Sequence, residues 1–272
     1  MQINTKLQPA KAIILAAGVG SRIRPLTDNC PKSLLKVAGV PILERMITNI
    51  MACGISEFVI VLGYLDSQIK EFVRARFPGL HVTYILNDRY EDTNTGFSLL
   101  LTRAANEGAG FIKFDADVVF TPDILSRLIA DTADTALCID RNIKLEAEEI
   151  KVVVDKDWRI LKASKTVDPN IAVGESIGIE KISASTATLL FAELGAMMTR
   201  ETHHQDYYEA AYERLMTLDV AFHAVDITGL DWVEIDTYDD FIEANRMFTH
   251  PVPLIAQVHG HLLHTSADSL GF

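Results

Sequence analysis

The chain has 272 residues, of which 49% are hydrophobic and 23% charged, and these proportions exclude disorder over most of its length. Its net charge of −12 argues against nucleic acid and anionic membranes as partners, because an acidic surface repels both. Three cysteines without a CxxC pair, and no apolar run of about 18 residues, favour a cytoplasmic protein without disulfides, zinc or a membrane span.

The first half of the chain alternates short apolar runs with amphipathic segments. A buried strand at 12–15 enters a glycine loop, and a helix that starts at Pro41 ends at Gly54. Further strands are expected at 58–62, 81–86 and 111–114, and further helices at 65–77, 96–106 and 122–129. This alternation predicts βαβ crossovers and an α/β fold, with a Rossmann-like mixed, mostly parallel sheet flanked by helices.

The pattern changes after Asp140. Two short strands at 150–154 and 158–163 are joined by an Asp-Lys-Asp turn, and 174–182 is a third strand, which together predict an antiparallel β insert at about 148–182. Later helices are expected at 185–198, 206–216 and 238–248, and a later strand at 220–225. We expect one domain over residues 1–249, followed by an unassigned C-terminal tail at 250–272.

A glycine loop with neighbouring cations follows the first strand. Gly18 and Gly20 let the backbone approach a ligand and expose its N–H groups, and Arg22 and Lys32 add positive charge beside the loop. These residues predict a site for a triphosphate. The loop is neither a P-loop, which needs Gly-Lys followed by Ser or Thr, nor a dinucleotide fingerprint, because Ile23 replaces the third glycine.

Two acidic motifs are candidates for a metal site. Asp115 and Asp117 come just after the strand at 111–114, and ligands of open α/β sheets bind at the carboxyl ends of strands. Oxygen ligands there suit Mg²⁺, although an Asp-x-Asp pair in a turn is also common without a metal. Glu234 and Asp236 alternate with apolar residues, so they point the same way from an extended segment. Asp236 alternatively lies in the N-cap region of the last helix.

These motifs resemble those of a known family. Segments 15–32 and 37–43 resemble the signature of the sugar-phosphate nucleotidyltransferase superfamily. Segment 87–99 is similar to the Asn-rich segment of the branch that contains phosphocholine and 2-aminoethylphosphonate cytidylyltransferases. Asn94 matches the first Asn of that pattern and Ser98 its Ser, whereas a Thr stands in place of its second Asn.

The resemblance implies a Mg²⁺-dependent cytidylyltransferase. A phosphate or phosphonate oxygen of a small acceptor would attack the α-phosphorus of CTP, and pyrophosphate would leave; no general base is needed because the nucleophile is already an anion. Arg22 would hold the β- and γ-phosphates, and Lys32 would bridge the α-phosphate and the attacking group. The resemblance assigns the metal to Asp117, Glu234 and Asp236. It assigns nucleotide binding to Leu15, Ala17, Gly18, Gly20, Asn87, Asn94, Ser98 and Asp115.

Three further segments resemble the acceptor-binding elements of the family. Lys165 matches a lysine that meets the acceptor's phosphate, although a strand-edge lysine is ordinarily solvated. Glu175 and Ser176 belong to a segment that lines the acceptor pocket. Tyr207 and Tyr208 belong to an aromatic-acidic patch suited to an ammonium group, with packing on the helix face as the alternative. Phosphocholine, 2-aminoethylphosphonate and other zwitterionic phosphates all fit as acceptors.

Two other functions are left open by the sequence. A sugar-1-phosphate uridylyl- or thymidylyltransferase would use UTP or dTTP, and the segment 94–98 argues against it. A non-catalytic nucleotide-sensing subunit of the same fold is the second alternative. The joint presence of Arg22, Lys32, Asp117 and Asp236 argues against that one. The sequence leaves the oligomeric state open, with a homo-oligomer among the options.

Overall fold

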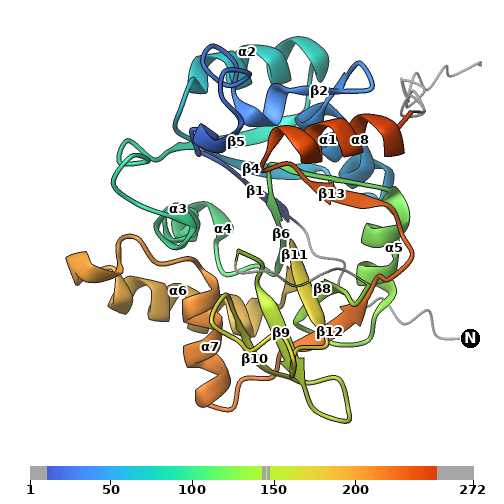
Figure 1. Cartoon of the computed structure of the whole chain (residues 1–272). Coiled ribbons are helices and arrows are strands. Elements are labelled where there is room, and N and C mark those ends of the chain that lie inside the picture. Colours follow the sequence, from blue (N-terminus) through green and yellow to red (C-terminus); the bar gives the residue numbers. More distant parts are fainter. Residues whose placement is uncertain (1–10, 143–144, 146–147, 250–272) are drawn as a thin grey trace, which may run out of the picture.

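The computed structural model describes residues 11–142, 145 and 148–249, and within them the centre is a nine-stranded sheet (Figure 1). Four neighbouring strands run parallel in the order β6 (Phe111–Asp115), β1 (Lys11–Ala16), β4 (Glu57–Leu62) and β5 (His81–Leu86). The long strand β11 (Gly174–Ile182) pairs antiparallel with β6 and connects these strands to the rest. The other members are β8 (Ala136–Asp140), β9 (Lys151–Val154), β10 (Ile160–Ser164) and β12 (His223–Asp226).

The expected mixed sheet with antiparallel strands is confirmed. Strands β9 and β10 form the expected hairpin, and they extend the main sheet because β9 pairs with the start of β11. The sequence analysis did not predict β8, whose buried run Ala-Leu-Cys-Ile pairs with both β11 and β12. The predicted tail at 250–272 lies outside the described residues.

Helices cover both faces of the sheet. On one face lie α1 (Ile42–Ala52), α2 (Asp66–Arg76) and α5 (Pro122–Ala130), and on the other lie α3 (Thr95–Leu101), α6 (Ala184–Met197) and α7 (Glu209–Thr217). The helix expected at 96–106 is divided, and α4 (Arg103–Asn106) follows α3 after Thr102. The Thr102 hydroxyl donates to the carbonyl of Leu99, a side-chain bond that competes with regular helix bonding. No helix of the described part is long and apolar enough to cross a membrane.

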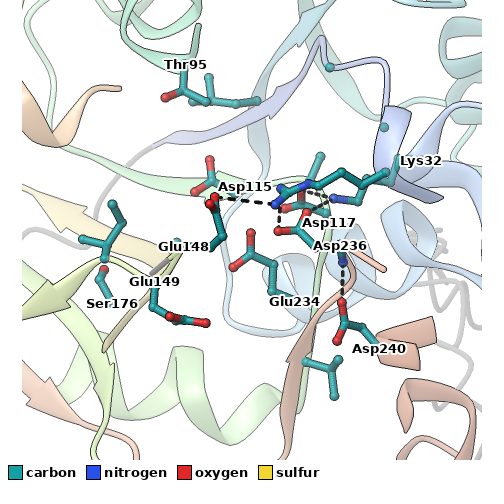
Figure 2. Close-up of a pocket in the computed structure, with 18 of the residues that line it drawn as sticks. Lys32, Thr95, Asp115, Asp117, Glu148, Glu149, Ser176, Glu234, Asp236 and Asp240 are labelled. Carbon is teal, nitrogen blue, oxygen red and sulfur yellow. Dashed lines mark hydrogen bonds and ion pairs between the residues drawn. The ribbon is translucent and has the colours of Figure 1, made fainter. Parts of the chain in front are cut away.

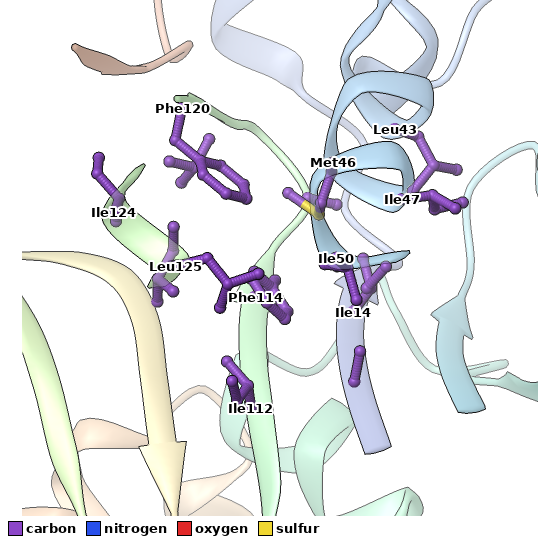
Figure 3. Close-up of a cluster of buried hydrophobic side chains, with 14 of the residues drawn as sticks. Ile14, Leu43, Met46, Ile47, Ile50, Ile112, Phe114, Phe120, Ile124 and Leu125 are labelled. Atoms are coloured by element: carbon purple, nitrogen blue, oxygen red, sulfur yellow. The ribbon is translucent and has the colours of Figure 1, made fainter. Parts of the chain in front are cut away.

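The alternation of apolar side chains along β1 produces the two buried layers. Ile14 belongs to the cluster that contains Met46 and Ile50 of α1, as Figure 3 shows, whereas its neighbour Ile13 belongs to the opposite cluster with Leu190 of α6. Successive side chains of a strand point to opposite faces, so a continuous apolar run is buried on both sides. The first strand therefore lies in the centre of the sheet, between the two apolar layers. Its carboxyl end leads into the glycine loop.

A third, smaller layer stands beside the carboxyl ends of the central strands. It contains the ribbon of β7 (Val118–Phe120) and β13 (Trp232–Glu234), the short strands β2 (Lys36–Val37) and β3 (Val40–Pro41), and α8 (Tyr238–Met247). One apolar cluster joins these elements to Ile23 of the first 3₁₀ turn (Ser21–Ile23). Two further 3₁₀ turns span Lys32–Leu34 and Glu201–His203. This layer carries both the glycine loop and the second acidic motif.

A substitution at Gly63 tests the close packing between β1 and β4. A Cβ added to Gly63 would lie 2.6 Å from the carbonyl oxygen of Ala17 and 2.8 Å from Cβ of Tyr90, so the backbone must shift. We expect Gly63→Ala to lower the free energy of unfolding by about 1–3 kcal/mol. Gly195→Ala, inside α6 where the nearest atom is 3.9 Å away, should instead raise it by about 0.5–1 kcal/mol. Urea denaturation measures both, and an unchanged Gly63→Ala would contradict the packing.

Candidate active site

A cavity of about 1120 Å³ opens at the carboxyl ends of β1 and β6, between the sheet and the small layer (Figure 2). Its walls come from the glycine loop, the ribbon, the β9–β10 hairpin, β11 and the start of α7. Among the described residues, three cationic side chains line it, namely those of Arg22, Lys32 and Lys165. The acidic lining residues are far more numerous: Asp115, Asp117, Asp140, Glu148, Glu149, Glu175, Glu209, Glu234, Asp236, Asp239, Asp240 and Glu243.

The glycine loop borders this cavity in the expected way. Gly20 has φ of +65°, a left-handed conformation that glycine adopts without steric cost, and the Thr27 hydroxyl donates to its carbonyl at 2.7 Å. A Cβ added at Gly18 would meet nothing within 4 Å, so this part of the loop faces open space. Leu15, Gly18 and Gly20 all line the cavity. The loop therefore leaves room for a ligand beside the backbone.

The β7–β13 ribbon brings the two acidic motifs together. Val118 pairs with Glu234 across the ribbon, and the amide of Ile235 donates to the carbonyl of Asp117 at 3.1 Å. As a result, Asp117, Glu234 and Asp236 each offer a carboxylate oxygen, and these oxygens lie within 4.8 Å of one another. Asp236 also lies in the N-cap region of α8, next to the N-cap residue Thr237, which forms a capping box with Asp240.

Lys32 lies between two of these carboxylates. Its Nζ is 2.7 Å from Oδ2 of Asp117 and 2.7 Å from Oδ1 of Asp236 (Figure 2). Burial alone would lower the pKa of Lys32, but the two carboxylates outweigh it and raise that pKa, so the side chain stays charged. Arg22 also binds Asp236, at 2.6 Å, and lies 3.8 Å from Glu148. The two predicted phosphate-binding cations thus meet the predicted metal ligands in one place.

The carboxylate group fits a divalent cation. Oδ1 of Asp117 is buried with no hydrogen-bond partner among the described residues. The side chain of Glu234 stays accessible within the cavity, yet the loss of bulk water there and the charges of Asp117 and Asp236 raise its pKa well above the usual value. Lys32 offsets only part of this negative charge. Three carboxylates so arranged are the oxygen donor set that Mg²⁺ prefers.

A buried network of Lys113, Glu180 and Tyr208 holds Asp115 in place. The sequence analysis did not predict this network. Lys113 is fully buried, and its Nζ lies 2.8 Å from Asp115 and 2.9 Å from Glu180. Tyr208 donates from its hydroxyl to Asp115 at 2.6 Å, and its ring lies against Lys113. The sequence feature that could have revealed this network is a lysine inside the apolar run 111–114 together with a glutamate inside the strand 174–182. This network fixes the carboxylate of Asp115 at the cavity floor.

The Asn-rich segment mainly supports the cavity rim. The buried amide of Asn87 donates to the hydroxyls of Thr93 and Ser98, at 3.0 Å each, and its oxygen accepts from the amide of Arg89. Of the predicted nucleotide contacts, Ala17, Asn87 and Ser98 do not line the cavity, since a buried amide and its partners satisfy one another. Asn94 does line it, and its side chain also caps α3.

The predicted acceptor residues form the opposite side of the cavity. Nζ of Lys165 lies 3.0 Å from Glu148 and 4.6 Å from the ring centroid of Tyr207, so this lysine is not merely solvated. Glu175 and Ser176 line the wall from β11. Tyr208 is 2% exposed, so its ring is mainly packed, whereas Tyr207 is 40% exposed. The sequence analysis did not single out Glu148, which bridges Lys165 and Arg22.

A family model described as the MobA-like NTP transferase domain matches residues 12–163, more than half of the chain. The chain belongs to this family. The match includes the glycine loop, Lys32 and the first acidic motif. This membership confirms the resemblance to nucleotidyltransferases that segments 15–32 and 37–43 indicated.

Relatives of this MobA-like chain include several cytidylyltransferases. It is 29% identical over 252 residues to the CMP-5'-(3-aminopropyl)phosphonate synthase of Streptomyces rubellomurinus, covering 89% of the chain and 39% of that protein. It is 39% identical over 107 residues to the choline-phosphate cytidylyltransferase of Streptococcus pneumoniae, covering 39% and 44%. It is 26% identical over 239 residues to the 2-aminoethylphosphonate cytidylyltransferase of Lancefieldella rimae, covering 85% and 93%. The chain therefore matches less than half the length of the first two.

Solved structures share the fold of the MobA-like chain. The CTP:phosphocholine cytidylyltransferase of Streptococcus pneumoniae has a TM-score of 0.71 at 23% identity, covering 88% of this chain and 98% of that one. The inositol-1-phosphate CTP transferase of T. maritima has a TM-score of 0.74 at 20% identity, covering 89% and 97%. These similarities confirm the Rossmann-like α/β fold expected from the sequence.

Mg²⁺ binding tests the carboxylate group of Asp117, Glu234 and Asp236. At roughly 100 times its Kd, Mg²⁺ should stabilise the wild-type chain by about 2.7 kcal/mol, because the ion binds only the folded site. Asp117→Asn should lose most of this gain. Asp157→Asn removes the same charge from an exposed turn and should respond as the wild type does. Thermal unfolding with and without Mg²⁺ measures the gain, and a full response of Asp117→Asn would contradict the assignment.

Proposed function

We propose that this chain is a Mg²⁺-dependent cytidylyltransferase that joins the CMP part of CTP to a small phosphate or phosphonate acceptor. The observation that carries the proposal is the meeting of Arg22 and Lys32 with Asp117, Glu234 and Asp236 at one glycine-lined cavity. The names of the relatives support the choice of CTP and of a phosphate or phosphonate acceptor.

The cations of the cavity suit a triphosphate. Arg22 has a side chain that is 54% exposed, so exchanging the carboxylate of Asp236 for a β- or γ-phosphate costs little. Lys32 is held by two carboxylates at the level of the glycine loop, where it would face the α-phosphate and the attacking oxygen. Fixed cations lower the barrier because charge develops on the phosphoryl oxygens during transfer.

The reaction needs alignment and charge neutralisation rather than proton transfer. The acceptor oxygen forms a bond to the α-phosphorus of CTP, the bond from that phosphorus to the β-phosphate bridge breaks, and pyrophosphate leaves with the bonding electrons. Mg²⁺ would be held by Asp117, Glu234 and Asp236, and when bound it would neutralise phosphate charge. We place the reaction in the cytoplasm, which agrees with three cysteines that are all free.

Lys32→Ala tests the role of the buried cation. We expect this variant to lower kcat by roughly 10²–10³-fold, the usual effect of removing one fixed charge donor from a transition state. Lys36→Ala, which removes an exposed lysine four residues away, serves as the control and should turn over normally. Pyrophosphate release is the assay, and an unchanged rate in Lys32→Ala would refute the role.

A matrix of nucleotides and acceptors tests the activity itself. With 2-aminoethylphosphonate or phosphocholine, CTP should release pyrophosphate at least about tenfold faster than UTP or dTTP does with glucose 1-phosphate, a difference of 1.4 kcal/mol or more. The reverse order would identify a sugar-1-phosphate transferase. Binding of CTP without release in every combination would identify a nucleotide-sensing subunit.

A further inference from the structure

The wall of the cavity opposite Lys32 holds a buried acid, one oxygen of which has no hydrogen-bond partner among the described residues. Glu175, near the start of β11, is 4% exposed, and its Oε2 is buried with no hydrogen-bond partner among the described residues. Figure 2 shows its neighbours Ser176 and Glu149 across the cavity from Lys32, with Glu234 between them. Such a buried carboxyl group stays protonated unless a ligand or neighbour compensates the charge of its ionised form.

The described groups that face Glu175 compensate its charge only in part. Asp140 at the end of β8 is its cross-strand neighbour, and Glu149 approaches from the preceding loop. Burial, and then the charges of Glu149 and Asp140, raise the pKa of Glu175 to about 8, against a smaller opposing effect of Lys151 on β9. Asp140 is held in place by the indole N–H of Trp232, at 2.8 Å. This wall therefore favours a positively charged ligand.

The geometry of the wall favours an organic cation over a metal ion. Among the described residues, the group whose acidic oxygens lie within 4.8 Å of one another is Asp117, Glu234 and Asp236. Asp140, Glu149 and Glu175 are not brought that close, so they do not form a compact oxygen cage. An ammonium group, which hydrogen-bonds to one or two carboxylates, requires no such cage.

The aromatic faces nearby are already occupied by cations. Nζ of Lys165 lies 4.6 Å from the ring centroid of Tyr207, and Nζ of Lys113 lies 3.7 Å from that of Tyr208. A quaternary ammonium group has no N–H donor and is recognised mainly through open aromatic faces. A primary or secondary ammonium group can instead donate hydrogen bonds to the unpartnered oxygen of Glu175.

We propose that the acceptor carries a primary or secondary ammonium group, and that Glu175 is the residue that selects it over quaternary ammonium and uncharged acceptors. The inference rests on the proposed function and specifies its substrate class. The phosphate or phosphonate end of the acceptor lies towards Lys32 and Lys165, and the ammonium end lies against Glu175 and Ser176.

The proposal requires a defined pH dependence. Below pH 8 the empty site holds Glu175 mostly protonated, and binding of an ammonium group must displace that proton. The KM for an amine acceptor should therefore fall about tenfold between pH 7 and pH 9. An acceptor without an amine should show no such fall, and neither should Glu175→Gln.

The experiment compares three acceptors with CTP at saturating Mg²⁺. They are 2-aminoethylphosphonate, its N,N,N-trimethyl derivative and ethylphosphonate, which lacks the amine. The wild type should favour 2-aminoethylphosphonate over both others by at least tenfold in kcat/KM. Glu175→Gln should raise the KM for 2-aminoethylphosphonate by at least tenfold and leave the KM for ethylphosphonate unchanged. Glu213→Gln is the matched control, because Glu213 also has a buried unpartnered oxygen but lies outside the cavity wall.

Thermal unfolding and the comparison of acceptors distinguish a failure of this inference from a failure of the proposed function. Because its pKa is raised from 4.5 to about 8, Glu175 destabilises the free fold increasingly as the pH rises through this range, and the full penalty is present above pH 8; Glu175→Gln should therefore unfold at the same or a higher temperature than the wild type at pH 9. Equal use of all three acceptors by the wild type, or an unchanged preference in a folded Glu175→Gln, would overturn the inference while leaving the cytidylyltransferase intact. Absence of pyrophosphate release with every acceptor would overturn the proposed function instead.

Discussion

The crowding of carboxylates around Lys32 is the interaction on which the rest of the site depends. Like charges repel strongly where bulk water is scarce, so Asp117, Glu234 and Asp236 remain together only beside a cation. The ribbon of β7 and β13 forces them together, and Lys32 and Arg22 partly neutralise them. Such a site favours a divalent ion, and the ion together with these two cations can hold a triphosphate that the acidic surface would otherwise repel.

A second group of charged and polar side chains lies buried beneath the cavity. Lys113, Glu180 and Tyr208 come from β6, β11 and the start of α7, and they surround Asp115 beneath the cavity floor. Burying charged groups usually costs stability unless each one finds a partner. Their positions connect three elements that meet at the site, so the network orients Asp115 and also ties the two halves of the sheet to the helix that covers them.

The cavity is divided by the chemistry of its walls. The glycine loop and the ribbon contribute backbone N–H groups, cations and the paired acidic motifs, which together suit phosphates and a metal ion. The opposite wall contributes the buried Glu175 beside Asp140, and this pair of acidic side chains favours a positively charged group. A zwitterionic acceptor matches this division, because its anionic end and its ammonium end are drawn to opposite walls.

The sequence by itself determined the features that depend on local pattern. Apolar periodicity located most strands and helices, and the spelling of the glycine loop excluded two other phosphate-binding loops. The assignment of the two acidic motifs to one metal site came from the family resemblance and stays a prediction. Tertiary structure decided what depends on pairing and burial. It set the register that places Val118 opposite Glu234, the partners that withdraw Asn87 from the cavity, and the burial of a Glu175 oxygen that has no partner among the described residues. Local periodicity shows which face of an element is buried. The groups that contact this face come from distant parts of the chain, and their pairing is fixed only when the sheet assembles.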